Sequence, residues 1–222
     1  MRFPLTPMLK VRLTSWGWWT VIFATLVCGT VTITINCFPL YEWFVYNHHL
    51  GAQVGWPARR VMIYYLQLLE FLQIPGVHLG RSLPITAKAM FHLHQVKVFM
   101  MINNCFTCGL IPVAWIGWRH LRARRERWLL LRPLAWTALG LIMVMGWMCL
   151  DFNSFFITFH QILFQNNDWL FNPKTDPVIK LLPESFFAAS FGVVVGLIGV
   201  EMAMIWWICW KELWNDEASG LG

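Results

Sequence analysis

Four long stretches of the chain are almost free of charge, and their lengths fit the thickness of a membrane. Charged residues are absent from 13–41, 98–118 and 133–150, and Glu201 is the single charge within 185–210. A helix rises 1.5 Å per residue and needs about 20 apolar residues to cross about 30 Å of hydrocarbon. The pattern predicts an all-α polytopic membrane protein, one integral membrane domain over 1–222, with transmembrane helices at about 16–39, 97–118, 133–152 and 185–210.

Two long segments, 42–95 and 151–184, separate these crossings and carry most of the remaining polar residues. Apolar residues recur at helical spacing over 59–72, which predicts an amphipathic helix along the bilayer surface. Thr86 is the predicted N-cap of a further helix, which carries His92 into the second crossing. The second segment is rich in asparagine and proline, and it is predicted to be a structured loop with short helices.

Composition and charge distribution add a direction to this topology. Of 222 residues, 58% are apolar and 13% are charged, and the net charge is +6. The basic loop 119–132 and the N-terminal Arg2, Lys10 and Arg12 are predicted to face the cytoplasm, because short basic loops are poorly translocated. An even number of crossings then places both termini in the cytoplasm and both polar segments outside. Anionic lipid accounts for the basic loop, so no nucleic-acid partner is expected.

Two of the seven histidines, His92 and His160, lie where segments enter or leave the membrane on the same side. A helical hairpin would bring both to one place, and imidazole suits general acid and base catalysis because its reference pKa is about 6.5. Asp151 and Asn153 precede His160 and are candidates to orient it or to stabilise an oxyanion. Spacing alone leaves a catalytic pair and a structural role open. Structural or interfacial roles are expected for the histidines at 48, 49, 78 and 120.

Three segments resemble one known family, the lipoprotein intramolecular transacylases of Gram-positive bacteria, which are four-helix integral membrane enzymes. The most specific match is 151–187, which begins DFNSFFITFHQILFQNNDWLFNPKTDP. The segments 65–72, YLQLLEFL, and 91–99, FHLHQVKVF, agree with it more weakly. Together the three segments cover parts of both outer regions.

The resemblance implies a reaction and a pair of catalytic residues. Such enzymes move the sn-2 acyl chain of a diacylglyceryl-cysteine lipoprotein onto the free α-amine of the same cysteine, which gives the lyso-form. The catalytic histidines carry over to His92 and His160, with the base hypothesised to be His160, although the roles are exchangeable. The chain departs from the family pattern at three positions. Gln95 stands where an acid is expected, Tyr64 where asparagine is expected, and Phe71 where tyrosine is expected.

The implied partners are a diacylated bacterial lipoprotein and membrane lipid, and the reaction requires neither a cofactor nor a metal. Supporting or substrate-binding roles are hypothesised for a further set of residues: Tyr65, Gln95, Lys97, Asp151, Asn153, Asn166, Trp169 and Asp176. Glycines in the fourth crossing fit intramolecular packing and dimerisation equally, which leaves the oligomeric state open.

Three other functions compete with this interpretation. In a haem-binding electron-transfer subunit, His92 and His160 would be axial ligands. In a metal-dependent hydrolase, the ligands would be His92, His94, His160 and Asp151. A non-enzymatic membrane scaffold would use the polar segments to bind a partner.

Overall fold

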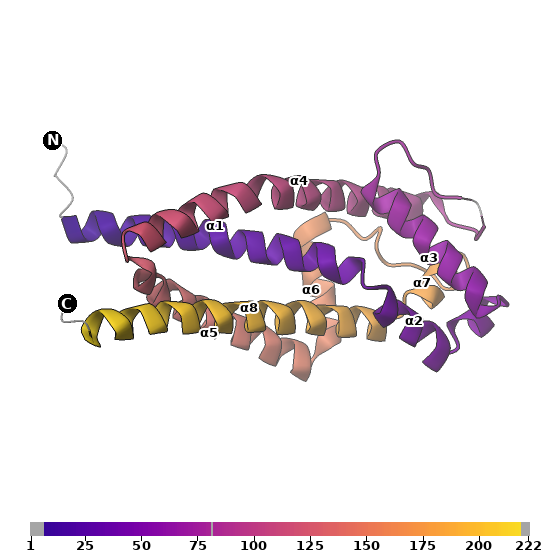
Figure 1. Ribbon diagram of the computed structural model, residues 1–222. Coiled ribbons are helices and arrows are strands. Elements are labelled where there is room, and N and C mark those ends of the chain that lie inside the picture. Colours follow the sequence, from indigo (N-terminus) through magenta and orange to yellow (C-terminus); the bar gives the residue numbers. More distant parts are fainter. Residues whose placement is uncertain (1–6, 81, 219–222) are drawn as a thin grey trace. The chain divides into compact units, whose positions relative to one another are not determined.

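The computed structural model describes residues 7–80 and 82–218, and side chains within 14–80 and 82–214 (Figure 1). Within these ranges the chain forms helices and turns without any strand, as predicted. In chain order the elements are α1 (Pro7–Ile35), α2 (Phe38–Asn47), the 3₁₀ helix η1 (Leu50–Val54), α3 (Ala58–Gln73), α4 (Ala87–Ala123), the 3₁₀ helix η2 (Arg127–Leu130), α5 (Leu131–Leu150), α6 (Phe152–Phe164), α7 (Val178–Leu181) and α8 (Glu184–Ala218). The N-terminal Arg2 lies outside the described residues, as do the side chains of Lys10 and Arg12.

Four helical segments of the described chain are long and apolar enough to cross a membrane, which agrees with the predicted number. They are Thr14–Ile35, Ala87–Ala123, Arg127–Leu150 and Glu184–Trp214. Helix α4 has 37 residues, so its length of about 55 Å exceeds the hydrocarbon thickness. The predicted span 97–118 is therefore the central part of a longer helix.

Contacts divide the chain into two compact units, and each of the four long helices contributes residues to both. The first unit contains the described residues up to Thr30, Phe106–Met145 and those from Val194 onward. Its buried cluster consists of Trp19, Ile22, Leu121, Leu130, Leu134, Ile198, Met202 and Cys209.

Polar links join the helices within this first unit. The Trp19 indole N–H donates to the Thr137 hydroxyl at 2.8 Å. The Arg127 guanidinium donates to the Glu212 carboxylate at 2.7 Å and lies over the Trp118 ring. Such links satisfy polar groups that would otherwise be costly among apolar side chains.

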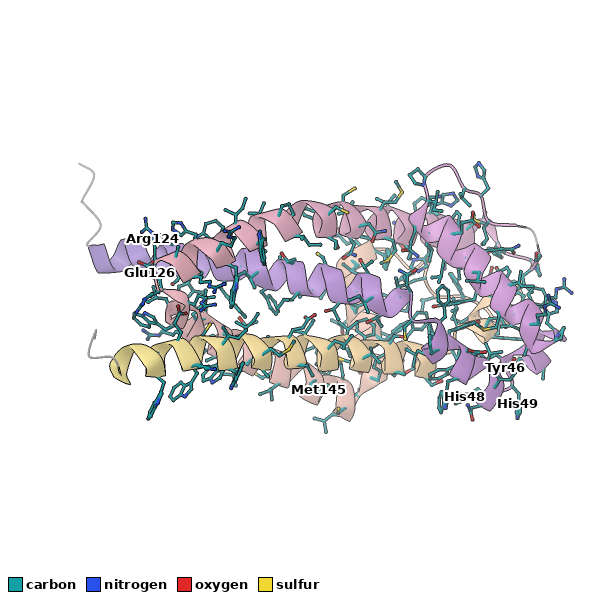
Figure 2. The ribbon with its side chains drawn as sticks, viewed as in Figure 1. Tyr46, His48, His49, Arg124, Glu126 and Met145 are labelled. Atoms are coloured by element: carbon teal, nitrogen blue, oxygen red, sulfur yellow. The ribbon has the colours of Figure 1, made fainter. Side chains whose placement is uncertain are left out.

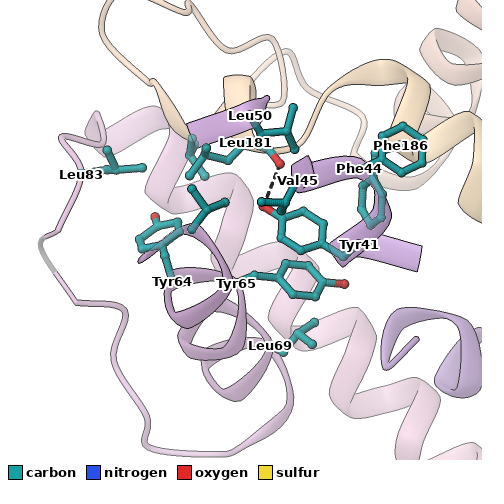
Figure 3. Packing of buried hydrophobic residues seen from close by; sticks show 12 residues of the cluster. Tyr41, Phe44, Val45, Leu50, Tyr64, Tyr65, Leu69, Leu83, Leu181 and Phe186 are labelled. Carbon is teal, nitrogen blue, oxygen red and sulfur yellow. Dashed lines mark hydrogen bonds between the residues drawn. The ribbon is translucent and has the colours of Figure 1, made fainter. Parts of the chain in front are cut away.

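The second unit comprises Val31–Cys105 and Gly146–Val193, and its core is built around stacked tyrosines. The rings of Tyr41 and Tyr65 are 3.7 Å apart and nearly parallel. The Tyr41 hydroxyl donates to the backbone oxygen of Leu181 at 3.0 Å (Figure 3). This bond joins α2 to α7 and thus ties the two polar segments of the sequence together.

The amphipathic pattern in 59–72 correctly predicted a helix, α3, whereas its placement along the bilayer surface stays a prediction. Its residues at helical spacing, Val61, Tyr65, Leu68, Leu69 and Leu72, are all buried. The opposite face remains exposed. At the end of α2, the side chains of Tyr46, His48 and His49 are also exposed (Figure 2).

Candidate functional site

Helix α4 begins where its first backbone N–H groups find acceptors. The Thr86 hydroxyl accepts from the N–H of Ala89 at 3.2 Å, as expected for an N-cap. The Asp176 carboxylate accepts from the N–H of Thr86 at 2.7 Å. These bonds place His92 in the second turn of the helix, where its side chain is buried, with 7% exposed.

Aromatic edges and faces surround the His92 ring. Its centroid lies 4.5 Å from that of Phe164 and 5.6 Å from that of Phe171, both in edge-to-face geometry. No described residue forms a hydrogen bond with Nδ1 of His92, although this nitrogen is buried. Buried polar atoms are nearly always paired, so an unpaired one calls for a functional explanation.

Helix α6 positions the second histidine. The Asp151 carboxylate caps the helix by accepting from the N–H of Ser154 at 3.0 Å. In the third turn, Nδ1 of His160 lies 2.8 Å from the backbone oxygen of Phe156. A carbonyl can only accept, so this bond assigns the proton to Nδ1 and leaves Nε2 with a free lone pair.

The two imidazoles face each other across α4 and α6. Their centroids are 5.9 Å apart and their planes are inclined by 38°. The pair is separated by 68 positions in the sequence, and it lies wholly within the second unit. This arrangement places two proton-transferring groups beside a common point, as acid and base catalysis requires.

Desolvation controls the charge of His160. Burial lowers its pKa below the usual value, and the hydrogen bond with Phe156 opposes this effect in part. Within the described chain, no carboxylate forms a hydrogen bond with either histidine. The neutral form of His160 is therefore favoured at neutral pH, which is the form that a general base needs.

Asn166 connects the surroundings of the two histidines. Its side-chain amide donates to Oε1 of Gln95 at 3.2 Å and to the backbone oxygen of Phe164 at 2.9 Å. Its backbone oxygen accepts from the indole of Trp169 at 2.8 Å. The Trp169 ring lies 4.8 Å from His160, so α4, the end of α6 and the following loop are joined at this residue.

The other hypothesised residues lie around the pair without hydrogen bonds to it. Asp176, which is buried, accepts from Thr86 and Thr175. Its burial disfavours charge, but these hydrogen bonds outweigh that effect and lower the pKa of its carboxyl. Asn153 is exposed near the start of α6, beside the capping Asp151.

Lys97 and Tyr65 belong to other contacts of the second unit. The Lys97 ammonium donates to the backbone oxygen of Val77 at 2.9 Å and lies over the Phe71 ring. The Tyr65 hydroxyl donates to the backbone oxygen of Ile35 at 3.2 Å. Both side chains are structural links in this arrangement.

Two residues that depart from the family pattern, Tyr64 and Phe71, are buried away from the histidine pair. Tyr64 is buried in the aromatic cluster with its ring against Trp56, and burial raises its pKa to about 12. Phe71 is buried beneath Lys97 and His94. Neither ring contacts the histidine pair.

Sequence reasoning missed the aromatic walls of the site. Phe156, Phe164 and Phe171 all contact a histidine, yet none was a candidate. The spacing of Phe156 and Phe164, four residues before and after His160, was the available signal, because such positions share a helix face.

The residues considered as metal ligands do not come together in this structure. Among the residues that the structure describes, no group of three or more histidine, cysteine, aspartate or glutamate side chains is arranged to hold a metal ion. Asp151 caps α6, and His94 turns to the Phe71 ring. The four ligands considered for a metal-dependent hydrolase are thus not gathered at one point.

The fold and the site define a helical polytopic membrane protein with a facing pair of histidines, one buried and one partly buried. Residues 17–187 match the family described as lipoprotein intramolecular transacylase Lit. The chain therefore belongs to that family, and it is a membrane acyltransferase that catalyses intramolecular acyl transfer. This membership decides against the haem-binding subunit and the scaffold.

Solved structures of a Bacillus cereus protein, described as the membrane integral lipoprotein intramolecular transacylase Lit, share the fold. One is 21% identical, with a TM-score of 0.85, over 94% of this chain and 98% of the other. Two more structures carry a histidine-to-arginine or a histidine-to-alanine mutation, each with a TM-score of 0.79. The first is 21% identical over 95% of both chains, and the second is 20% identical over 94% of this chain and 96% of the other. No curated protein matches the sequence significantly.

Proposed function

We propose that this enzyme moves the sn-2 acyl chain of a diacylglyceryl-cysteine lipoprotein onto the α-amine of that cysteine, with His160 and His92 as its catalytic residues. Family membership supports the reaction class. The single observation that carries the assignment of residues is the facing pair of imidazoles, 5.9 Å apart. The lipoprotein itself supplies both the acyl donor and the acceptor.

The bond changes balance without any co-reactant. The lone pair of the neutral α-amine attacks the ester carbonyl carbon, a C–N bond forms, and the carbonyl oxygen becomes an oxyanion. The nitrogen then loses a proton, the bond from carbon to the glycerol oxygen breaks, and that oxygen gains a proton. An ester and an amine have become an amide and an alcohol, which is the lyso-form.

His160 is the proton shuttle in this proposal. Its Nδ1–H is committed to the backbone oxygen of Phe156, so Nε2 can accept the proton of the attacking nitrogen. The same nitrogen can deliver that proton to the departing glycerol oxygen. The lowered pKa of His160 keeps Nε2 unprotonated at neutral pH.

His92 is the group that polarises the ester carbonyl. Its imidazole is buried, and Nδ1 has no hydrogen-bond partner among the described residues. A neutral imidazole carries one ring proton, and donating it to the carbonyl oxygen stabilises the developing oxyanion. Such a donor needs no positive charge, which suits an apolar site.

No nucleophilic serine or cysteine is required, because donor and acceptor belong to one molecule. Holding the amine against the ester carbonyl can supply roughly 7 to 11 kcal/mol when the alignment is ideal. The enzyme's main task is then to hold the lipid-bearing N-terminus of the lipoprotein so that its amine lies against the ester carbonyl. Gln95, Asn166, Trp169 and Asp176 are positioning residues in this scheme, because they hold the histidine-bearing elements together.

We further propose that the site faces the extracytoplasmic side, with both termini in the cytoplasm. His92 and Arg122 are 30 residues apart on α4, or about 45 Å along the helix. This length exceeds the hydrocarbon thickness. The arginine-rich end favours the cytoplasm, so His92 belongs at the outer boundary, where an exported lipoprotein is anchored.

Separate replacement of each histidine by alanine tests the assignment. The variants are expressed in a bacterium that makes diacylated lipoproteins, and mass spectrometry of a reporter lipoprotein measures the lyso-form. We expect the lyso-form to disappear with either variant and to persist with His94→Ala, an exposed histidine on the same helix. Undiminished lyso-form production by a well-expressed His92→Ala or His160→Ala variant would exclude that residue.

A further inference from the structure

The proposed base lacks the carboxylate that often stabilises an imidazolium ion. Nδ1 of His160 is bonded to a neutral backbone carbonyl. The titratable ring that faces it from α4 is the neutral His92, which carries no negative charge to offset the imidazolium. In the following loop, Asp168 uses its backbone N–H to bond with Asn166, and among the described contacts its carboxylate does not reach either histidine. Another group must offset the charge that forms when His160 accepts a proton.

Aromatic faces are the groups in contact with this ring. The centroid of His160 lies 4.1 Å from that of Phe156 and 4.8 Å from that of Trp169, with interplanar angles of 48° and 34°. Cations within about 6 Å of a ring centroid are attracted by the π electrons, and indole gives the strongest attraction. Phe164 lies farther away, at 5.6 Å with its plane inclined by 30°, and Phe159 is edge-to-face with His160 at 5.5 Å.

Trp169 is fixed in this position from outside the helix that carries His160. Its indole N–H donates to the backbone oxygen of Asn166 at 2.8 Å, and the Asn166 amide donates to Gln95 of α4. The side chain is buried, with 9% exposed. A buried face attracts a cation more strongly, because water competes less.

We infer that Trp169, together with the Phe156 ring, stabilises the His160 imidazolium that forms during acyl transfer, in the place where other enzymes use a carboxylate. The inference rests on the proposed function, in which His160 accepts the amine proton at Nε2. After that transfer Nδ1–H still donates to Phe156, and the positive charge is shared over a ring that contacts both aromatic side chains. Release of the proton to the glycerol oxygen restores the neutral state.

An aromatic partner suits this site better than an anion would. A carboxylate would raise the pKa of His160 and hold the proton, whereas the base must be neutral before attack and must release its proton to glycerol. The indole face offers a smaller stabilisation, about 0.4 to 1.5 pH units when its 0.5 to 2 kcal/mol is converted at 1.36 kcal/mol per unit. It therefore reduces the penalty of burial without abolishing it.

The test is an NMR titration of the full-length protein in detergent micelles, with isotope-labelled histidine and the His160 signal assigned by its loss in His160→Ala. We expect Trp169→Leu to lower the His160 pKa by about 0.4 to 1.5 pH units, and Trp169→Phe by less. Both variants lose the bond with Asn166, so the difference between them reports the aromatic face alone. Trp147→Leu, which removes a tryptophan with no contact to His160, is the matched control and should leave the pKa unchanged.

The kinetic counterpart is a loss of lyso-form production of about 2- to 30-fold in Trp169→Leu, with partial retention in Trp169→Phe. Equal His160 pKa values in the leucine and phenylalanine variants would overturn the inference. If Trp169→Leu does not fold, Phe156→Leu replaces it. This variant keeps the backbone carbonyl that accepts from His160 and removes the aromatic ring of Phe156, so it must also lower the His160 pKa. The titration does not depend on catalysis, so its failure is distinct from failure of the proposed function, which the His160→Ala assay judges.

Discussion

The Asn166 side chain offers the sharpest test of how the two histidines are held together. It makes three hydrogen bonds, donating to Gln95 and to the backbone oxygen of Phe164 and accepting from the N–H of Asp168. Replacement by alanine removes all three bonds and leaves partners unpaired within a partly buried region. Because Trp169 is anchored to the backbone of the same residue, its ring and His160 should lose their alignment with α4.

The magnitude follows from the number of bonds. Each neutral hydrogen bond contributes about 1 kcal/mol net, so Asn166→Ala should cost about 2 to 3 kcal/mol of unfolding free energy. Misplacement of catalytic groups by about 1 Å can reduce the rate by about 100-fold. We expect lyso-form production to fall by about 10- to 100-fold.

A double-mutant cycle isolates the link between the loop and α4. Purified Asn166→Ala, Gln95→Ala and the double variant are compared by thermal unfolding in detergent and by the initial rate on a diacylated lipopeptide. A coupling energy of about 0.5 to 1.5 kcal/mol is expected, since the side chains share one bond. Asn167→Ala is the matched control, because the side chain of this neighbouring asparagine is exposed and was assigned no functional role. Additive effects within about 0.3 kcal/mol, or an equal loss of rate in the control, would refute the role of the link.

Three further outcomes are expected. Burial lowers the pKa of His160, so this side chain should be mostly neutral at pH 6.5 and should titrate with a midpoint below that pH. Below the midpoint, the rate of acyl transfer should fall about tenfold for each pH unit. Asp176→Asn should lower the melting temperature at pH 7 by an amount equivalent to about 1 kcal/mol. Because the folded pKa of Asp176 is lowered, this difference should be present above the unfolded value of about 3.9 and vanish as the pH falls through the folded value. Gly117→Ala should destabilise the first unit by about 1 to 3 kcal/mol, because the new Cβ would overlap the Trp18 ring, whereas Gly109→Ala meets nothing within 4 Å.

Each of these outcomes has a defined contradiction. A His160 midpoint at or above pH 6.5 would show that burial does not control its charge. If the stability difference between Asp176→Asn and the wild type persisted unchanged in acid, the charge of Asp176 would not be its cause. Equal melting temperatures for the two glycine variants would contradict the close packing at Gly117.

The class of fold and the convergence of His92 and His160 were accessible from the sequence. Uncharged stretches of about 20 residues fix the number of crossings, because desolvation forbids unpaired charge in hydrocarbon. The helical spacing in 59–72 identified α3 as an amphipathic helix and the residues that share its apolar face, and Thr86 was recognised as a cap because its hydroxyl can serve the first free N–H groups. These features depend on residues that are close together in the chain.

The arrangement of the site depended on contacts that no local pattern encodes. The sequence suggested that His92 and His160 converge, but their spacing, the orientation of their rings and the proton on Nδ1 of His160 follow from how α4 and α6 pack. Asp151 and Lys97 were equally plausible partners by composition, yet the fold assigns one to a helix cap and the other to the Phe71 ring. Side-chain type and helical period are properties of the chain itself, whereas the neighbours of a buried imidazole are set by the packing of segments 68 positions apart.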